Sequence, residues 1–409
     1  MKTVAILTSH YPFYPGEQFI EDEIGYWGVQ TAVKVMLVPL TAAGEPRNVP
    51  NGIKINLMLS KTSKTLHKIL WLVPAFFSTV FWKELSFVFS SQGANVKCIW
   101  RALLCVSRVL RIENALAKIC KKDGSIDAMY CYWNEVQAYA AVRLKQRGII
   151  SRVVSRAHGY DVYQDRRDNG YMPLKRQFIN GMSSIMAISI QGKKYLVGTY
   201  HTLPKLVSIH RLGVPIPRVS SSASTPACLN IVSVSFCIAG KRIDKIIDAI
   251  ALVALNRKEI DINWTHIGGG PLLADLNKHA ESRFKGGRVN YRLVGNLPNC
   301  DVKKYYEFNH VDMFVNTSES EGVPVSIMEA MSYGVPVIAP DIGGISELVS
   351  NQNGRLLSEN PDVLEVFNAM LCLFSICKNV EFRAHAKTMV CQEYNAGKNY
   401  QALISAVVV

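Results

Sequence analysis

Residues Ser318-Glu-Ser-Glu-Gly-Val-Pro-Val-Ser-Ile-Met-Glu-Ala-Met-Ser-Tyr-Gly-Val-Pro-Val-Ile-Ala339 place a loop, a helix and a buried strand in immediate succession. Glu321 is followed by a glycine and a proline, which is typical of a helix start, and Gly334 ends the helix that carries Glu329. The apolar, β-branched run at 335–339 predicts a buried parallel strand. A loop and helix start of this kind hold phosphate with free backbone N–H groups and the positive end of the helix dipole.

The two carboxylates beside this helix start indicate a second chemical group on the same ligand. A carboxylate repels phosphate, but it accepts hydrogen bonds from sugar hydroxyls. Glu321 and Glu329 next to a phosphate-binding helix therefore predict a nucleotide sugar. Taken alone, two glutamates on a helix are ordinarily a cap and a solvated side chain, so the surrounding residues decide the interpretation.

Those surrounding residues carry a family resemblance. The pattern Glu321-x7-Glu329, followed by Gly343-Gly-Ile-Ser-Glu347 and Gly354-Arg-Leu-Leu357, resembles the C-terminal signature of family 4 (group 1) retaining glycosyltransferases of the bacterial surface-polysaccharide type. The resemblance implies the GT-B fold, in which two Rossmann-like, doubly wound α/β domains face each other across a cleft. It assigns the nucleotide sugar to the C-terminal domain and the acceptor to the N-terminal domain.

Apolar, strand-like runs alternate with helical stretches along the whole chain, which independently predicts doubly wound α/β sheets. The runs form two groups, and the Pro- and Ser-rich residues 214–227 between them are the expected linker. We therefore expect an acceptor-binding domain at 1–214, a nucleotide-sugar domain at 228–390 and a final helix at 391–409 that packs back on the first domain. The expected strands are 4–9, 33–38, 128–133, 152–157, 185–190, 206–211, 230–235, 262–267, 289–294, 313–316 and 335–339.

Composition limits the classes of protein that the chain can represent. Its 409 residues, 49% of them hydrophobic, suffice for full-sized cores and exclude disorder. Ten scattered cysteines without metal-like spacing are typical of buried or incidental thiols in a reducing compartment. The apolar run at 1–8 is too short for a signal peptide and predicts a first strand, so we expect a cytoplasmic protein.

The net charge of +14 is concentrated in one part of the N-terminal domain. Residues 53–122 surround the apolar, aromatic segment 69–82, which is shorter than the about 20 residues that a membrane-spanning helix needs. Such a segment flanked by Lys and Arg is typical of an anionic membrane surface, and a buried helix beside a solvated basic one is the alternative. No nucleic-acid-binding pattern accompanies the charge, so nucleic acid is not an expected partner. The basic residues of this region are Lys54, Lys61, Lys64, Lys68, Lys83, Lys97, Arg101, Arg108, Arg111, Lys118, Lys121 and Lys122, against two acids, Glu84 and Glu113.

The resemblance implies a set of donor-binding residues in the second domain. Lys241 matches the lysine that grips the diphosphate, and we expect it to act in catalysis together with Glu321. The arginine that precedes this lysine in the family is missing, so Arg242 is the expected replacement. Glu321 is expected to accept from hydroxyls of the donor sugar and Glu329 from the ribose. The other expected donor contacts are Gly269, Gly295, Asn296, Leu297, Gly322, Val323, Pro324 and Val325.

The first domain contributes fewer expected site residues. His158 follows the strand at 152–157, at the carboxyl end where doubly wound sheets bind ligands, and it resembles the family's histidine that contacts the donor sugar. Gly16 resembles the glycine loop near the diphosphate, where a Cβ would obstruct the ligand. Glu17, Tyr160 and Asp161 are the residues expected to face the acceptor.

A D-x-D triplet, which holds a divalent metal in the other main glycosyltransferase fold, does not occur in the sequence. Lys241, Arg242 and the helix start are then expected to neutralise the diphosphate, so the resemblance implies metal-independent transfer with retention and without a cofactor. A UDP-hexose is the favoured donor, with GDP-mannose second. The expected acceptor is a lipid-linked (polyprenyl diphosphate) glycan at the anionic inner face of the cytoplasmic membrane, in the biosynthesis of O-antigen, lipopolysaccharide or a similar polysaccharide.

Two other functions stay open at this point. One is a non-catalytic scaffold that has kept the fold, and the other is another GT-B enzyme such as a sugar-nucleotide epimerase.

Overall fold

The computed structural model describes residues 1–14, 16–17, 19–62 and 65–409, which form two compact units. The first unit comprises Met1–His210 together with Tyr400–Val409, and the second comprises Arg211–Asn399. The first unit thus ends slightly before residue 214, and residues 214–227 belong to the second unit. Ser224 there donates its hydroxyl to Asp312 at 2.6 Å. The expected linker is therefore anchored to the second unit.

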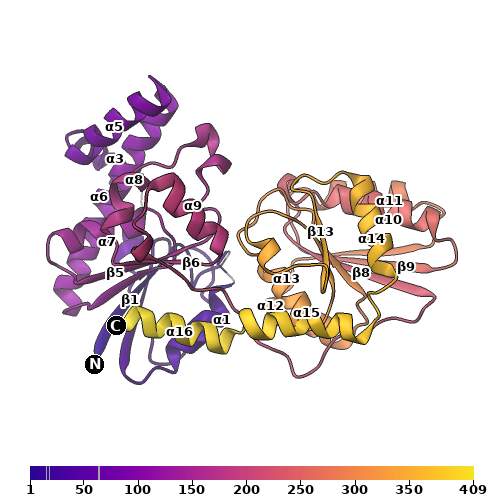
Figure 1. Ribbon diagram of the computed structural model, residues 1–409. Helices are drawn as coiled ribbons and strands as arrows, with labels where there is room; N and C mark the ends of the chain where they lie inside the picture. The colour runs from indigo at the N-terminus through magenta and orange to yellow at the C-terminus, as the bar shows by residue number, and fades with distance from the viewer. Residues whose placement is uncertain (15, 18, 63–64) are drawn as a thin grey trace. The chain divides into compact units, whose positions relative to one another are not determined.

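A parallel sheet in the order β3-β2-β1-β4-β5-β6-β7 forms the centre of the first unit (Figure 1). The sheet is buried on both faces, as its continuous apolar strands predict. In β1, Val4 and Ile6 belong to one hydrophobic cluster, whereas Ala5 and Leu7 belong to the cluster on the other face. The strands are β1 (Lys2–Thr8), β2 (Val33–Pro39), β3 (Lys54–Ile55), β4 (Ala128–Cys131), β5 (Arg152–Ala157), β6 (Ser184–Ala187) and β7 (Val207–Ile209).

Helices cover both faces of this sheet. On one face, α1 (Ile20–Gly28) packs together with the end of α16 (Ala396–Val408), which supplies Leu403 and Val407 to the cluster of Val4 (Figure 1). On the other face lies the long helix α6 (Val96–Asp123). The remaining helices of this unit are α2 (Met58–Lys61), α3 (Thr65–Leu70), α4 (Leu72–Phe76), α5 (Thr79–Gln92), α7 (Val136–Gln146), α8 (Lys175–Phe178), α9 (Ile190–Tyr200) and the 3-10 turns η1 (Gln164–Arg166), η2 (Asp168–Gly170), η3 (Ile179–Gly181) and η4 (Pro204–Leu206).

The second unit repeats the doubly wound plan with a parallel sheet in the order β10-β9-β8-β11-β12-β13. In both sheets the order reverses beside the first strand, which is the position where such sheets bind ligands at their carboxyl edge. The predicted α/β fold with two doubly wound sheets is confirmed. The strands are β8 (Cys228–Val234), β9 (Asp261–Ile267), β10 (Val289–Gly295), β11 (Met313–Val315), β12 (Val337–Pro340) and β13 (Gly354–Leu357).

Apolar helix faces bury the second sheet as well. Ile247 and Ile250 of α10 share a cluster with Val366 and Met370 of α14, so these two helices lie on the same face. The helices of this unit are α10 (Ile243–Asn256), α11 (Leu273–Phe284), α12 (Asn299–Phe308), α13 (Val325–Ser332), α14 (Val363–Phe374), α15 (Val380–Glu393) and the 3-10 turns η5 (Ala239–Lys241) and η6 (Ile345–Glu347).

Every strand expected from the sequence forms, with shifts of a few residues at the ends. Two further strands were missed. β3 is only two residues long, and β13 was recognised as a motif but not as a strand. Short edge strands lack the continuous apolar run that identifies a buried strand.

An exposed apolar surface covers α3, α4 and α5 of the first unit. The basic side chains of Lys68 and Lys83 lie exposed on the same helices. Lys64 lies outside the described residues. Arg111 is one of the basic residues that were expected to flank the apolar segment at a membrane surface, but it is buried and donates to the Thr62 carbonyl, so that expectation is wrong for Arg111. The members of this surface, called the apolar surface below, are Ile69, Leu70, Val73, Phe76, Phe77, Trp82 and Phe89.

Within the described residues, only α3–α5, taken together, include segments long and apolar enough to be considered as a membrane span. No single helix there combines sufficient length with sufficient apolar character to cross a membrane. The segments Lys68–Phe76 and Thr79–Gln92 pass this test only as a pair, and they are bent by 74° relative to each other.

A buried carboxylate attaches α5 to the rest of the first unit. Glu84 accepts hydrogen bonds from the Tyr171 hydroxyl at 2.7 Å, the Leu174 N–H at 2.8 Å and the Gln177 amide at 2.7 Å. Leu174 has a φ of 66°, which is strained for a non-glycine residue, and the bond to Glu84 helps to hold it there.

Removal of this carboxylate should destabilise the first unit. Glu84→Ala would leave several buried donors without an acceptor, so we expect the free energy of unfolding to fall by about 2–4 kcal/mol. Urea denaturation of the full chain, followed by tryptophan fluorescence, measures the change. Ser86→Ala, an exposed substitution on the same helix, is the control and should change little. Equal stability of both variants would contradict the anchoring part assigned to Glu84.

Candidate functional site

Lys241 and Glu321 are in direct contact in the second unit, although 80 positions separate them in the sequence. The Lys241 ammonium donates to Glu321 Oε1 at 2.5 Å, and both side chains are partly exposed. Lys241 ends η5 after β8, and Glu321 follows β11, the strand next to β8. Because the carboxyl ends of parallel neighbours lie at one edge, the fold brings this cation and this carboxylate together there.

The helix start that was predicted from the motif forms directly beside Glu321. α13 begins at Val325, and Pro324 occupies the preceding cap position. Gly344 donates its N–H to the Gly322 carbonyl at 2.6 Å. Gly343 has a φ of 59°, and a Cβ on it would lie 2.2 Å from the Glu321 carbonyl oxygen. The Gly-Gly pair of the motif therefore lets a second loop pack against the backbone of the first.

Glu329 lies on α13 and is almost completely buried. Its Oε1 accepts a hydrogen bond from the Asn299 amide at 2.6 Å. Asn299 is the first residue of α12, and it was not predicted as a site residue. Its signal in the sequence was its position two residues after Leu297, the last of the expected donor contacts at 295–297.

The two glycine-containing loops after β9 and β10 lie against each other. Gly268 donates to the Gly295 carbonyl at 2.8 Å, and Gly269 donates to Asn296 Oδ1 at 2.7 Å. A Cβ on Gly268 would lie 1.9 Å from the Ser235 carbonyl oxygen, so only glycine fits there. Leu297 follows in the same loop and is partly exposed. Gly269, Gly295, Asn296 and Leu297 thus form one cluster at the carboxyl edge of the sheet.

Arg242 is directed into the protein. Its guanidinium donates to the carbonyls of Thr317 at 2.8 Å and Ser318 at 3.1 Å and to the side chain of Asn360. The side chain is buried, and the backbone adopts a φ of 47° at the start of α10. These contacts hold the loop that leads to Glu321. Arg242 therefore positions this loop and does not have the free guanidinium that the expected phosphate contact would require.

In the first unit, His158 follows β5 in an aromatic environment. Its ring stacks on Tyr132 at a centroid distance of 4.9 Å and lies 4.6 Å from the ring of Trp133. The side chain is buried, yet among the described residues its Nε2 has no hydrogen-bond partner. A buried ring nitrogen that lacks a partner within the chain is suited to a ligand group.

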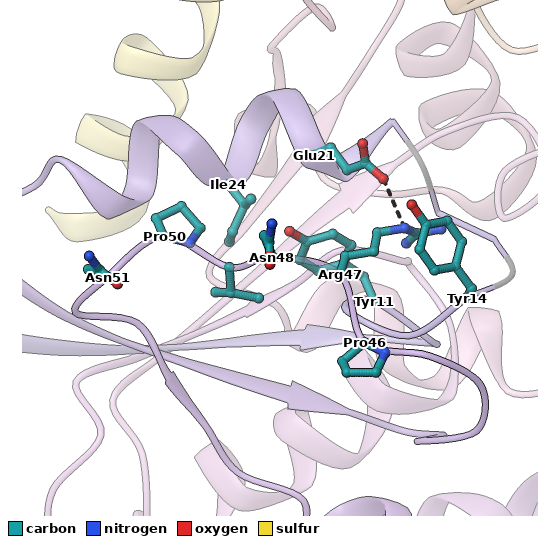
Figure 2. Close-up of a pocket in the computed structure, with 10 residues that line it drawn as sticks. Tyr11, Tyr14, Glu21, Ile24, Pro46, Arg47, Asn48, Pro50 and Asn51 are labelled. Atoms are coloured by element: carbon teal, nitrogen blue, oxygen red, sulfur yellow. Dashed lines mark ion pairs between the residues drawn. The ribbon is translucent and has the colours of Figure 1, made fainter. Parts of the chain in front are cut away.

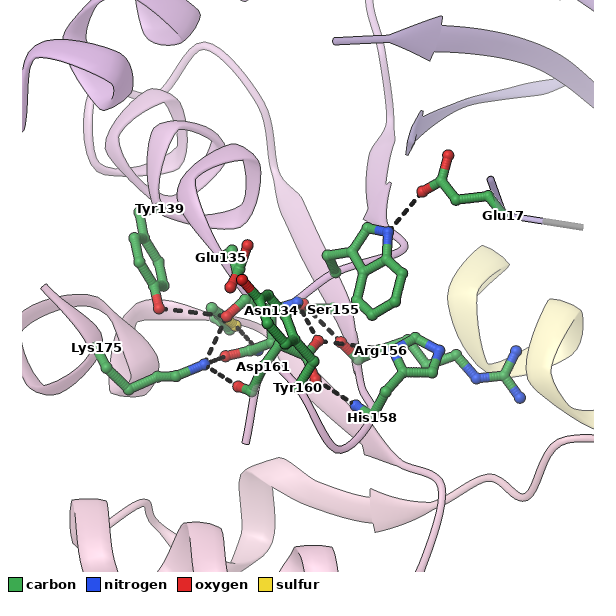
Figure 3. Close-up of polar contacts among 12 residues, drawn as sticks. Glu17, Asn134, Glu135, Tyr139, Ser155, Arg156, His158, Tyr160, Asp161 and Lys175 are labelled. Atoms are coloured by element: carbon green, nitrogen blue, oxygen red, sulfur yellow. Dashed lines mark hydrogen bonds and ion pairs between the residues drawn. The ribbon is translucent and has the colours of Figure 1, made fainter. Parts of the chain in front are cut away.

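Asp161 organises the loop around His158 (Figure 3). Its carboxylate accepts the N–H of His158 at 2.6 Å and of Asn134 at 2.8 Å, and Lys175 donates to its carbonyl at 2.6 Å. Burial raises the pKa of Asp161, but hydrogen bonding and charge from His158, together with Lys175, lower it more, so the net shift is downward. This completely buried carboxylate is not placed to face an acceptor, and that prediction is corrected. Tyr160, by contrast, is 66% exposed, and the Arg167 guanidinium lies over its ring.

Glu17 is also directed inward. Its carboxylate accepts the N–H groups of Ser9, His10 and Tyr11 and the indole N–H of Trp133, between 2.5 and 3.0 Å. The expected acceptor contact of Glu17 is therefore replaced by a structural contact that ties the turn after β1 to the end of β4.

A pocket of about 800 Å³ in the first unit is lined by residues that include Tyr14, Glu21 and Arg47 (Figure 2). Gly16 has a φ of 102°, which explains the requirement for glycine. Arg47 donates to the Gly16 carbonyl at 2.6 Å, pairs with Glu21 at 2.8 Å and lies over the Tyr14 ring. The sequence contained no signal for Arg47, because a lone arginine in a loop is ordinarily solvated.

The donor-site cluster of the second unit coincides with a known domain. The family described as glycosyl transferases group 1 matches residues 230–375. The chain carries a group 1 glycosyltransferase domain. This domain contains Lys241, Glu321 and Glu329, the residues that the sequence motif identified.

Similar proteins agree with this domain. WcaL of Escherichia coli (strain K12), a provisionally assigned colanic acid biosynthesis glycosyltransferase, is 27% identical over 287 residues, which span 66% of this chain and 68% of WcaL. The lipopolysaccharide outer core galactosyltransferase WaaB superposes with a TM-score of 0.69 at 16% identity, with 99% of both chains covered. Anabaena Alr3699/HepE, determined in complex with UDP, superposes with a TM-score of 0.64 at 14% identity and 99% coverage of both chains. The whole chain, including the region that matches the group 1 family, therefore has the GT-B fold.

The buried amine of Lys175 should make the stability of the first unit depend on pH. Burial lowers the pKa of Lys175 from 10.5 to about 8, although Asp161 and Glu135 oppose the shift. Between these two pH values the unfolded chain binds more protons than the folded chain, so the free energy of unfolding should rise with pH across this window. Denaturation of the full chain and of Lys175→Met at pH 7–11 isolates the contribution of this one group. Parallel pH profiles of the two proteins would contradict the shift.

Proposed function

We propose that the protein is a retaining, metal-independent glycosyltransferase. It would move a hexose from a nucleotide sugar to a lipid-linked glycan in the biosynthesis of a surface polysaccharide. The observation that carries the proposal is the contact of Lys241 with Glu321 beside the start of α13, within the group 1 glycosyltransferase domain. A cation, a carboxylate and free helix N–H groups at one sheet edge suit a ligand that combines phosphates with sugar hydroxyls.

Each group of this cluster has a separate part in the proposed reaction. Lys241 and the first N–H groups of α13 bind the diphosphate and stabilise the charge that develops on it. Glu321 accepts from hydroxyls of the transferred sugar, and Glu329, oriented by Asn299, accepts from the ribose. Gly269 and the loop at 295–297 contact the nucleobase through the backbone. His158 donates from its ring to the donor sugar.

The proposed reaction is a one-step transfer with retention. The bond between the anomeric carbon and the phosphate oxygen breaks, and a bond from that carbon to the acceptor hydroxyl oxygen forms on the same face. The proton of the acceptor hydroxyl passes to the departing phosphate oxygen. The acceptor oxygen attacks the anomeric carbon directly, so this route needs no enzymic nucleophile. Lys241 supplies the positive charge that the departing diphosphate requires.

A UDP-hexose is the favoured donor, with GDP-mannose second. The structure of HepE with bound UDP supports UDP for a chain of the same fold. Recognition of the base through backbone groups leaves few side chains in the sequence that discriminate between the two nucleotides.

The acceptor is proposed to be lipid-linked and presented at the inner face of the cytoplasmic membrane. The apolar surface of α3–α5 supports this part of the proposal, because aromatic and aliphatic side chains lie exposed there beside Lys68 and Lys83. Exposed apolar patches rimmed by cations suit the interface of an anionic bilayer.

Substitution of Glu321 and of Glu329 should affect different kinetic constants, because the two side chains are proposed to bind different parts of the donor. Glu321→Gln weakens placement of the sugar, so kcat should fall on the order of 10²-fold. Glu329→Gln weakens ribose binding, so the donor KM should rise about tenfold with a smaller change in kcat. Release of UDP is measured with UDP-glucose or UDP-galactose as donor and a bacterial lipid extract as acceptor source.

Glu359→Gln, which changes an exposed carboxylate of the same unit, is the control for these kinetics. Unchanged kinetics in both site variants would mean that the motif is structural. If neither UDP nor GDP binds the unmodified protein in calorimetry, the scaffold alternative replaces the proposed activity.

The membrane part of the proposal predicts salt-sensitive binding to anionic vesicles. Phosphatidylglycerol-containing vesicles should sediment the protein at low salt and less of it as salt rises, because exposed charges are screened beyond about 10 Å at 0.1 M. Phe77→Ser should reduce the bound fraction severalfold, since Phe77 is 76% exposed on the apolar surface. Phe308→Ser is the matched control, because Phe308 is also 76% exposed but lies on α12. Equal sedimentation with neutral and anionic vesicles, or equal loss in both variants, would contradict membrane docking.

A further inference from the structure

A second pocket in the first unit has the composition of an anion site. It encloses about 280 Å³ between α6, the start of α7 and the loop at 160–173. This volume is close to the lower end of the about 300–1,000 Å³ typical of small-molecule sites, so it suits one compact group. The lining includes three arginines, Arg101, Arg108 and Arg167, and one acid, Glu135.

The three arginines differ in the hydrogen bonds and ion pairs that they form within the protein. Arg167 pairs with Glu135 at 2.9 Å, and Arg101 donates to the Asp168 carbonyl at 2.9 Å. Arg108 is exposed, and within the described ranges it has no hydrogen bond or ion pair. Three guanidiniums against one carboxylate leave an excess of two positive charges. Guanidinium groups bind phosphate oxygens in a bidentate manner, so this excess matches a doubly charged diphosphate diester.

An apolar path on α6 adjoins the cationic pocket. Leu104 lines the pocket, and Trp100 and Val96 precede it by one and two helical turns on the same face. These side chains are 38%, 53% and 76% exposed. The stripe leads from the pocket toward the start of α6, which follows α5 and its exposed Phe89. A ligand with a charged head and an apolar tail would satisfy both features.

The pocket is connected to the proposed reaction site by neighbouring residues (Figure 3). Glu135 follows Asn134, which donates its N–H to Asp161, and Asp161 in turn holds His158. Tyr160, which lines the pocket, lies between His158 and Asp161 in the same loop. Tyr171, which also lines the pocket, donates to Glu84 of α5, so a hydrogen bond joins the pocket lining to the helix that carries part of the apolar surface.

We propose that this pocket binds the diphosphate of a polyprenyl-diphosphate-linked acceptor, with the lipid chain following Leu104, Trp100 and Val96. The inference rests on the proposed glycosyltransferase function and specifies the part of its acceptor that the first unit recognises. Arg108 and Arg101 contact the phosphates, whereas Arg167 is positioned by Glu135 and Tyr160 at the edge of the pocket.

Farnesyl diphosphate is a probe that contains both chemical parts of this ligand. Its binding to the full chain is measured by calorimetry in the presence of saturating UDP, which occupies the proposed donor site. Arg108→Gln should weaken the affinity about tenfold, because one charge-assisted contact is lost. Lys118→Gln removes the same charge from an exposed position further along α6, outside the pocket, and should leave the affinity unchanged.

Two further probes distinguish the sources of binding. Inorganic diphosphate should bind more weakly than farnesyl diphosphate, and Leu104→Ser should reduce that difference. Equal affinity for inorganic phosphate would indicate an unselective anion site and would overturn the inference. So would binding that Lys241→Gln abolishes and Arg108→Gln leaves intact, because the probe would then occupy the donor site.

The outcomes also separate this inference from the proposed function. Binding of UDP that depends on Lys241, combined with no effect of Arg108→Gln on farnesyl diphosphate, would refute the pocket and leave the glycosyltransferase proposal standing. Absence of both UDP and GDP binding would refute the proposed function itself.

Discussion

The close approach of backbone segments at the carboxyl edge of the second sheet is the constraint on which the donor-site cluster depends. A Cβ on Gly268 or on Gly343 would lie 1.9 and 2.2 Å from a carbonyl oxygen, respectively, so any other residue would push the loops apart. The contact between Lys241 and Glu321 exists because these loops come from neighbouring parallel strands. The cluster is thus positioned by backbone packing, and its charged side chains only complete it.

Buried carboxylates perform a comparable task in the first unit. Glu17, Glu84 and Asp161 each accept backbone N–H groups from a loop that has no regular structure of its own. A buried carboxylate without partners would cost several kcal/mol, so the two to four donors around each one are a condition of folding. These residues define where the loops lie, and they are therefore unavailable to a ligand. Tyr160 nearby is exposed, and in the part of the chain that the structure describes Nε2 of the buried His158 ring has no hydrogen-bond partner, so these two groups are the better candidates for contact with a ligand.

The basic charge of the first unit has two different environments. On α3–α5 the lysines border exposed apolar side chains. This arrangement suits the interface of an anionic bilayer, where phosphate headgroups lie next to the hydrocarbon core. On α6 the arginines line a pocket, where several donors converge on one small volume. Glu84 connects the two, because it joins α5 to Tyr171 in the pocket wall. A lipid-linked substrate would require both environments in this order, with the chain in the bilayer and the charged group near the reacting sugar.

Several properties were available from the sequence alone, because they depend on local pattern. The alternation of apolar runs and helices predicted both sheets, and the spacing of glycine, proline and glutamate predicted the start of α13 beside Glu321. Short edge strands such as β3 were missed, since two residues carry no periodicity.

Burial and long-range pairing were decided only by the tertiary structure. Glu17, Asp161, Arg111 and Arg242 looked like surface or ligand-facing groups, but each is buried and hydrogen-bonded to backbone atoms. For Arg111 and Arg242 these atoms belong to Thr62 and Thr317, which are 49 and 75 positions away in the sequence. The contact of Asn299 with Glu329 and the arginine-lined pocket could not be predicted. A sequence pattern indicates which element a residue belongs to, but it does not indicate which other segments pack around that residue.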